Sequence, residues 1–262
     1  MILDIYIMIL LFVFGLVMGS FFMVVGSRLP KGESIIKPRS HCDECGHILK
    51  WYELIPVFSF VFQLGRCSKC KTKLSIAYPF IEILNGFLFS LSYALYGFSY
   101  EMIAFLIISC ILVLVFVSDF MYMIILDEPL IIGSILILIL KLYFFGFNTF
   151  TRSIYSGLIM FIFMLLVKLI GDKVFKRESL GGGDVKLVTF FGFVFGVRLS
   201  FVSIVLGSFL AFPYAIFTSI SKKDREVPFG PFLILALLLV FIYMEPIKEF
   251  LNLFVFGFGE LF

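Results

Sequence analysis

Two aspartates stand at the ends of long apolar runs, where ionisable side chains are costly. Asp119 follows an apolar run that ends at Ser118, and Asp184 follows the glycine run Gly181 to Gly183 at the start of another. Two carboxylates that face each other share one proton at neutral pH, so one acts as general base and the other as general acid. Such a pair hydrolyses a peptide bond through an activated water. We therefore predict that Asp119 and Asp184 are the catalytic pair of a membrane aspartic peptidase.

The competing interpretation is that these acids are ordinary solvated loop residues. Asp119, Asp127 and Glu128 form one acidic cluster, and Asp184 stands apart from it. Two details favour a site. The three glycines before Asp184 allow close approach of another backbone and positive φ angles. Asp119 has no lysine or arginine within seven residues on either side, so no local ion pair explains it.

Four of the five cysteines form two Cys-x-x-Cys pairs, Cys42/Cys45 and Cys67/Cys70, with twenty-one residues between the pairs. This spacing is typical of a zinc ribbon, in which two knuckles supply four thiolates to one tetrahedral ion. Disulfide bonds are the alternative. The surrounding segment is strongly basic, which favours the reducing cytoplasm and therefore a metal.

Both histidines of the chain, His41 and His47, lie beside the first cysteine pair. We expect them to be solvated loop residues, because four cysteines already complete a tetrahedral site. Their position also argues against a serine or cysteine peptidase, which needs a histidine base elsewhere. Cys110 lies inside an apolar run and is expected to pack there.

The amino-acid composition indicates that these residues lie in a membrane protein. The 262 residues are 61% hydrophobic, include 37 phenylalanines and are only 15% charged, which excludes an ordinary soluble protein. A helix crosses the ~30 Å hydrocarbon core with about 20 residues. We predict an all-α polytopic membrane protein with eight transmembrane helices. The expected spans are 3–26, 76–97, 102–118, 129–146, 153–171, 185–198, 200–220 and 229–244.

Charge placement predicts the orientation. The polar segment 28–75 carries nine Lys/Arg against four Asp/Glu, so the positive-inside rule places it in the cytoplasm and the N-terminus outside. Alternation then puts the basic stretches around 173–186 and 222–226 inside. Asp119 and Asp184 fall on this same cytoplasmic side. Residues 51–62 are apolar but too short to span, and we expect them to lie against the bilayer surface.

Several motifs together give the chain a resemblance to the type IV prepilin peptidases, bifunctional membrane peptidases and N-methyltransferases of the GxGD type. The resemblance covers nearly the whole sequence. Its motifs are Gly19-Ser20-Phe21, Arg28-Leu29-Pro30, the two cysteine pairs around Trp51-Tyr52 and Ile55-Pro56-Val57, Gly65-Arg66-Cys67, Tyr78-Pro79-Phe80-Ile81-Glu82, the segment Asp119 to Asp127, and Gly181-Gly182-Gly183-Asp184-Val185-Lys186.

The resemblance implies roles for single residues. The catalytic aspartates of the family match Asp119 and Asp184, and Asp127 matches a second acid that supports the peptidase site. Gly181, Gly183 and Lys186 belong to the glycine-aspartate motif and are expected to support the same site. The chain departs from the family at two positions, with Met23 in place of an asparagine and Leu126 in place of a proline.

The resemblance also implies methylation of the new amino terminus with S-adenosylmethionine. In the family this activity is associated with the cysteine-bearing segment, so Glu82 and Gly65 become candidate methyltransferase residues. Glu82 can orient the substrate amine, or it can simply neutralise Lys71 or Lys73. The sequence contains no Gly-x-Gly-x-x-Gly motif after a strand, so a Rossmann-type donor site is not expected.

The expected organisation is a first transmembrane helix (1–27), a cytoplasmic zinc-binding domain (28–75) and a membrane peptidase domain (76–262). The expected partners are prepilin or pseudopilin substrates of a pilus, type II secretion or competence system and the bacterial inner membrane, without nucleic acid. One alternative is a zinc-stabilised membrane transporter or scaffold, which would distribute polar residues through the midplane of several helices. Another is an aspartic peptidase without methyltransferase activity, against which the cysteine-bearing segment argues.

Overall fold

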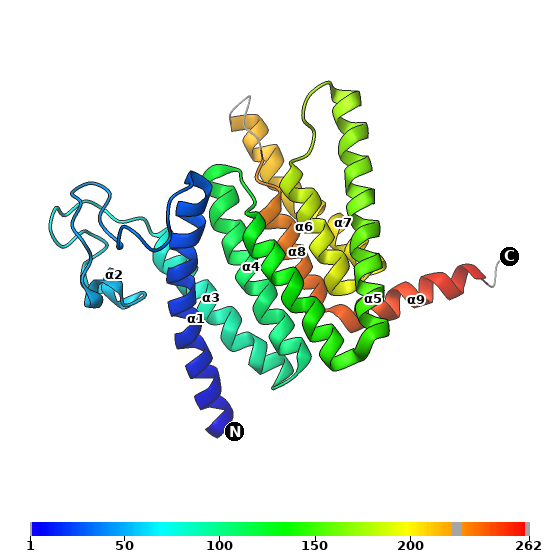
Figure 1. Ribbon diagram of the computed structural model, residues 1–262, viewed down its shortest axis with the longest axis horizontal. Helices are drawn as coiled ribbons and strands as arrows, with labels where there is room; N and C mark the ends of the chain where they lie inside the picture. The colour runs from blue at the N-terminus through cyan, green and yellow to red at the C-terminus, as the bar shows by residue number, and fades with distance from the viewer. Residues whose placement is uncertain (1, 222–226, 260–262) are drawn as a thin grey trace. The chain divides into compact units, whose positions relative to one another are not determined.

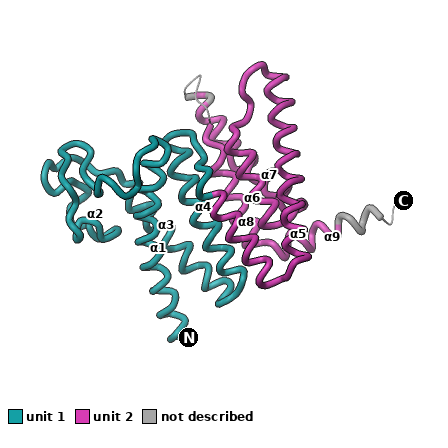
Figure 2. Tube along the Cα trace, in the orientation of Figure 1, with its two compact units in different colours: residues 1–129 teal, residues 130–262 magenta. Residues whose placement is uncertain are grey.

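The computed structural model of the protein describes residues 2–221 and 227–259, and within these residues it is built from helices and loops without strands. The basic stretch 222–226 therefore lies outside the described residues. The chain forms two compact units, residues 1–129 and 130–262 (Figure 2). Figure 1 shows the helices in each unit, and each unit is described by itself below.

Three long helices form the helical bundle of the first unit. They are α1 (Ile2–Arg28), α3 (Ala77–Tyr96) and α4 (Tyr100–Tyr122), and all three pack against one another. The 27 residues of α1 extend over ~40 Å, enough to cross a bilayer. α4 is the buried member of the group, and its apolar side chains Phe105, Ile108 and Val113 are inaccessible to solvent.

Glycines bring α1 and α3 into close contact. A Cβ atom added to Gly15 would lie 2.7 Å from the Cα of Gly86, and one added to Gly19 would lie 2.9 Å from the Cα of Glu82. Only residues without a side chain allow backbones this near, which is a common way for membrane helices to associate. At the same contact Asn85 Nδ2 donates a 2.7 Å hydrogen bond to the carbonyl of Gly15.

The cysteine-bearing segment connects α1 to α3. It contains two short 3₁₀ turns, η1 (Leu29–Lys31) and η2 (Trp51–Leu54), and one short helix, α2 (Phe58–Phe62). The remainder is loop. A cation-π contact places Lys31 5.6 Å from the ring centre of Tyr122, which holds η1 near the end of α4.

The second unit begins at Leu130, near the start of α5 (Asp127–Phe175), a 49-residue helix that breaks at Gly146. Gly146 has φ 78° and ψ −177°, a conformation that side chains exclude. Figure 1 shows that the chain reverses direction at this point, so that α5 forms two arms. The two arms correspond to the separate predicted spans 129–146 and 153–171, and the break at Gly146 falls on the last residue of the first span.

The short helix α6 (Gly182–Phe195) is largely buried inside the second unit. It contacts α7 (Val197–Ser221) and α8 (Gly230–Ile242), and its side chains Leu187, Phe190 and Phe191 are inaccessible. A helix that is apolar on every side is expected in such a position. After α8 the chain bends by 82° into α9 (Met244–Gly259).

Each of the eight predicted spans falls on a helix or on one arm of α5. By length and apolar composition, however, four helices of the described chain qualify as membrane spans, and five if the bent pair α8 and α9 is counted as one. α3 carries Pro79, Glu82 and Asn85, which lower its hydropathy, and the 14 residues of α6 are too few. The chain is therefore a helical membrane protein with several spans.

Candidate active site and metal centre

The four paired cysteines come together in one cluster. The sulfur atoms of Cys42, Cys45, Cys67 and Cys70 all lie within 4.8 Å of one another. Sulfur to sulfur, Cys42 is 3.8 Å from Cys70 and Cys45 is 4.0 Å from Cys67. A disulfide bond requires ~2.05 Å, whereas four sulfurs bound at ~2.3 Å to one tetrahedral ion lie ~3.8 Å apart. The spacing fits metal binding, and the described cysteines form no disulfide.

Two loops of the same construction present these cysteines. In the first, the N–H of Gly46 donates to the carbonyl of Cys42, and in the second the N–H of Lys71 donates to the carbonyl of Cys67. Gly46 and Lys71 both have positive φ, 65° and 62°, at equivalent positions of the two turns. Each loop is closed by a further antiparallel bridge, His41 with Ile48 and Arg66 with Lys73.

The ionisation of the thiols also suits a cation. The contact with Thr72 lowers the pKa of Cys70 to about 6. The His47 backbone lowers the pKa of Cys45, but burial and the three neighbouring thiols outweigh this and raise it to about 11. Thiolates this close together repel one another, and a bound cation removes the repulsion as it takes the place of the protons.

Neither histidine lies in the cysteine cluster. His41 Nδ1 donates to the carbonyl of Arg39, and His47 Nε2 lies 3.1 Å from Glu53 Oε2. This arrangement agrees with the expectation that the two histidines are not metal ligands. His47 is nevertheless partnered rather than solvated, because it joins the first cysteine loop to η2.

Glu53 is the buried acid of the cysteine-bearing segment, with 6% of its surface exposed. Its Oε2 atom accepts hydrogen bonds from the N–H of Lys50 at 2.8 Å and from His47. Burial alone would raise the pKa of this carboxyl, but the hydrogen bonds from Lys50, Ser68 and His47 keep it below its usual value. Glu53 therefore carries a negative charge inside the folded segment.

Asp184 lies in the first turn of α6 and is buried, with 7% of its surface exposed. The N-terminus of a helix stabilises negative charge, because its N–H groups point outward and the helix dipole is positive there. A Cβ atom on Gly181 would lie 3.3 Å from Asp184 Oδ2, whereas one on Gly182 would meet no atom within 4 Å. The run does not use positive φ, since Gly181 has φ −65°. It instead leaves space beside the carboxylate.

Asp119 lies at the opposite end of its helix, in the last turn of α4, and has 6% of its surface exposed. Its carbonyl accepts a hydrogen bond from the N–H of Met123, which has a left-handed conformation and ends the helix. Gly26 of α1 packs directly on Val117, so α1 supports this turn. A helix C-terminus gives no dipolar stabilisation to a carboxylate.

The other predicted peptidase residues occupy more exposed positions. Asp127 begins α5, a short turn after the end of α4, and Lys186 lies in the first turns of α6. Both are exposed. Asp119 belongs to the first compact unit and Asp184 to the second. That the two carboxylates act as a pair is therefore a proposal, which is argued from their burial and their helix ends.

The two candidate methyltransferase residues both border α2. Glu82 is buried in α3, and its Oε2 atom accepts a 2.7 Å hydrogen bond from the N–H of Val57, just before α2. Among the described residues, neither Lys71 nor Lys73 pairs with it. Gly65 follows α2 with φ 65°, and a Cβ atom there would lie 3.0 Å from the Phe60 ring. Glu82 and Gly65 thus hold the two ends of the α2 region.

Sequence reasoning missed Lys141, a buried lysine in α5. Its Nζ donates to Ser153 Oγ at 2.9 Å and to the carbonyls of Phe193 and Val194 at 2.7 and 2.8 Å. These carbonyls belong to the last turn of α6, where a positive charge is stabilised by the helix dipole. Lys141 is the only charged residue between Glu128 and Arg152, and this isolation in an apolar run was the available signal.

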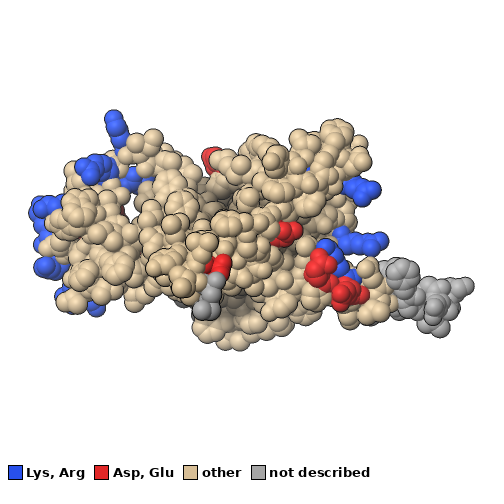
Figure 3. All heavy atoms as spheres, turned by 90° about the horizontal axis from the view of Figure 1, so that it is seen from below, with Lys and Arg blue, Asp and Glu red and all other residues tan. Residues whose placement is uncertain are grey.

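Charge is distributed unevenly over the surface. Figure 3 shows lysine and arginine side chains gathered at the end of the first unit that holds the cysteine-bearing segment, while most of the visible surface is uncharged. The exposed basic residues of this segment are Lys31, Lys37, Arg39, Lys50, Arg66, Lys69, Lys71 and Lys73. A basic segment beside apolar helices is typical of the cytoplasmic face of a membrane protein.

Comparison with known proteins gives two family matches. Residues 13–96 match the bacterial peptidase A24 N-terminal domain, and residues 106–216 match the type IV leader peptidase family. No solved structure matches the chain.

Three relatives found by sequence are each named prepilin leader peptidase/N-methyltransferase. The Bacillus subtilis protein is 32% identical over 92% of this chain and 96% of its own length. The Vibrio cholerae protein is 29% identical over 90% of this chain and 97% of its own length. The Myxococcus xanthus protein is 36% identical over 70% of this chain and 54% of its own length.

Proposed function

The chain belongs to the type IV leader peptidase family and is a membrane-bound prepilin leader peptidase and N-methyltransferase, and we propose that Asp119 and Asp184 perform the peptide hydrolysis. The observation that carries this proposal is the burial of both carboxylates at helix ends. In the predicted orientation both ends lie on the cytoplasmic side. A buried carboxylate at such a position needs a partner, and a second carboxylate with a shared proton is one.

We propose different roles for the two aspartates because their helix ends differ. The N-terminus of α6 stabilises the ionised form of Asp184, and the C-terminus of α4 gives Asp119 no such stabilisation. The shared proton then resides on Asp119. Asp184 takes a proton from the attacking water as general base, and Asp119 donates its proton toward the carbonyl oxygen of the scissile peptide. Asp127, Gly183 and Lys186 are proposed to support this site, and Gly181 provides the space beside Asp184.

The proposed topology has eight spans, with the N-terminus outside and residues 28–75 in the cytoplasm. The basic surface of this segment supports that orientation through the positive-inside rule. The proposed division is a first helix (1–27), a metal-binding segment (28–75) and a peptidase region (76–262). The substrates are prepilins or pseudopilins, whose leader is cut at the cytoplasmic face of the inner membrane.

We propose that the cysteine cluster binds Zn²⁺ as a structural ion. Four thiolate ligands with tetrahedral spacing are the preferred set for this metal. The methyl donor of the transferase reaction is S-adenosylmethionine, which supplies an electrophilic methyl group to the new terminal amine. Glu82 and Gly65 border the α2 region in which we place this activity.

One experiment tests both activities. Purified protein in detergent is incubated with a prepilin, with and without S-adenosylmethionine, and the new amino terminus is identified by mass spectrometry. We expect a free terminus without the donor and a terminus heavier by one methyl group with it. An intact substrate under both conditions contradicts the peptidase assignment. A cleaved but never methylated product contradicts the transferase alone.

A further inference from the structure

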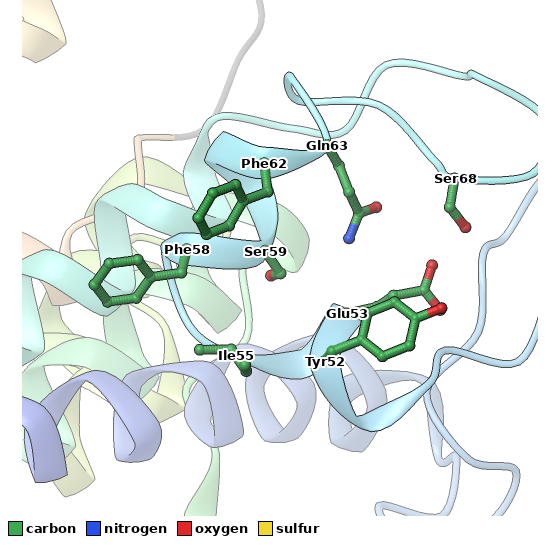
Figure 4. Close-up of a pocket in the computed structure, with 8 residues that line it drawn as sticks. All are labelled: Tyr52, Glu53, Ile55, Phe58, Ser59, Phe62, Gln63 and Ser68. Atoms are coloured by element: carbon green, nitrogen blue, oxygen red, sulfur yellow. The ribbon is translucent and has the colours of Figure 1, made fainter.

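A cavity of about 360 Å³ opens in the cysteine-bearing segment (Figure 4). Its walls come from η2, α2 and the second cysteine loop, all within the first compact unit. Pockets that hold small molecules have volumes of about 300–1,000 Å³, so this cavity can hold a ligand of nucleoside size. Neither the peptidase mechanism nor the metal cluster uses it.

The lining of the cavity has an apolar part and a polar part. The apolar part consists of Tyr52, Ile55, Phe58 and Phe62. Three of these are aromatic, and aromatic faces suit a flat ring or a cation. Phe62 is 83% exposed and Phe58 58% exposed, so the apolar part is open rather than filled by the protein itself.

The polar part is defined by Glu53, with Gln63 and Ser68 opposite. Figure 4 shows the side chains of these three residues directed toward the same space. Glu53 Oε2 already accepts hydrogen bonds from Lys50 and His47. The other carboxylate oxygen, Oε1, is buried and has no hydrogen-bond partner that meets the distance and angle criteria. Because hydrogen bonds keep the pKa of Glu53 low, the cavity carries a negative charge. This charge disfavours phosphates and other ligands of net negative charge, and it favours a ligand of net positive charge that also carries hydroxyl groups.

The cavity also lies beside the start of α3, on the side of the molecule where we propose that the leader is cut. α2 starts immediately after Val57, whose N–H is bonded to Glu82 in the second turn of α3. The first turns of α3 therefore hold the wall of the cavity, and in the proposed topology these turns lie at the cytoplasmic face of the membrane. The amine produced by leader cleavage is proposed to emerge at this same membrane face.

We propose that this cavity is the binding site for S-adenosylmethionine, with the aromatic part taking the flat adenine and the Glu53 side taking the hydroxyl and cationic groups. The assignment rests on the proposed methyltransferase function. It makes Glu53, which no family motif singled out, a donor-binding residue.

The test is equilibrium binding of radiolabelled S-adenosylmethionine to the full-length protein in detergent. Ser59 lines the cavity, and Ser59→Phe fills it. Val61→Phe adds a ring to the same helix at an exposed position outside the cavity and serves as the matched control. We expect Ser59→Phe to raise the Kd at least tenfold and Val61→Phe to change it less than twofold. Metal content and leader cleavage should match wild type in both.

Photo-cross-linking provides a test that needs no variant. Trypsin cuts after Lys50 and Arg66, so a single peptide, 51–66, contains every lining residue except Ser68. Ultraviolet irradiation of wild-type protein with labelled S-adenosylmethionine should place the label in this peptide. S-adenosylhomocysteine should protect it, and phenylalaninamide, which imitates the new terminus, should not.

The outcomes separate the two proposals. A wild-type protein that methylates its substrate while Ser59→Phe binds the donor normally, or while the label falls outside 51–66, overturns the cavity assignment alone. Protection by phenylalaninamide and not by S-adenosylhomocysteine also overturns it, because the cavity then takes the product terminus. A wild-type protein that neither binds the donor nor methylates overturns both the assignment and the transferase function.

Discussion

The cysteine-bearing segment and the membrane helices are stabilised in different ways. Within residues 28–75 only Cys42, Glu53 and Cys67 are buried, so this segment has no apolar core of its own. α4, by contrast, buries thirteen residues, most of them apolar. A segment of this size without a core depends on a metal or another cross-link, while the helices depend on close packing. Damage to one region should therefore leave the chemistry of the other region intact.

The strongest test of this separation is the removal of either proposed catalytic carboxylate. We expect Asp119→Asn and Asp184→Asn to reduce leader cleavage by at least ~10²-fold, because each loses a proton-transfer group. Methylation of a substrate that has already been cleaved should continue at the wild-type rate. Mass spectrometry of both reactions measures the two effects. Substantial cleavage by either variant would refute the proposed pair.

The opposite separation is expected when the cysteine cluster is broken. Cys42→Ser and Cys67→Ser each remove a buried sulfur and should abolish stoichiometric metal binding, about one ion per chain in the wild type. Methylation should be lost before cleavage. Metal analysis by mass spectrometry is the measurement, and Cys110→Ser, outside the cluster, is the control. Unchanged metal content in the cluster variants would exclude the site.

Lys141 tests how the helices of the second unit are held. Lys141→Met keeps the length of the side chain but leaves the carbonyls of Phe193 and Val194 without this donor. We expect a loss of about 1–3 kcal/mol in the free energy of unfolding. Lys173→Met, at an exposed position, should change it by less than about 0.5 kcal/mol. Unfolding in detergent followed by circular dichroism compares them, and equal stability would mean that Lys141 has no structural role.

The smallest predicted effect concerns the glycine run. Gly181→Ala places a methyl group 3.3 Å from Asp184 Oδ2, so the carboxylate must shift by a few tenths of an ångström. We expect a several-fold decrease in kcat/KM for leader cleavage. Gly182→Ala, whose methyl group meets no atom within 4 Å, should cleave normally. The two variants differ by one position in the chain, and identical rates would show that space beside Asp184 is unimportant.

The sequence predicted the features that depend on local pattern. Apolar runs indicated the helices, and two Cys-x-x-Cys pairs indicated a cluster because each pair folds its own loop. The family was also correctly identified from ordered motifs. Eight spans were expected from hydropathy, but α3 and α6 fall short of a span by composition or length.

Features that join distant segments could not be predicted. Lys141 meets Phe193 and Val194 only after α5 reverses at Gly146, and Glu82 meets Val57 only after the cysteine-bearing segment folds back on α3. In the sequence Glu53 cannot be distinguished from a solvated loop acid, because its hydrogen bonds with Lys50 and His47 form only in the folded segment. Periodicity and spacing carry no information about such contacts.

The hydrogen bond between Glu82 and Val57 has a consequence for the order of events along the substrate. The cysteine-bearing segment is attached to the helices at the end of α1, at the start of α3 and by this bond between them. Its middle is therefore bonded to α3, in addition to its two covalent connections. On the proposed assignments, this attachment keeps the methyltransferase segment beside the membrane helices, and we expect a newly released terminus to be methylated without leaving the membrane surface.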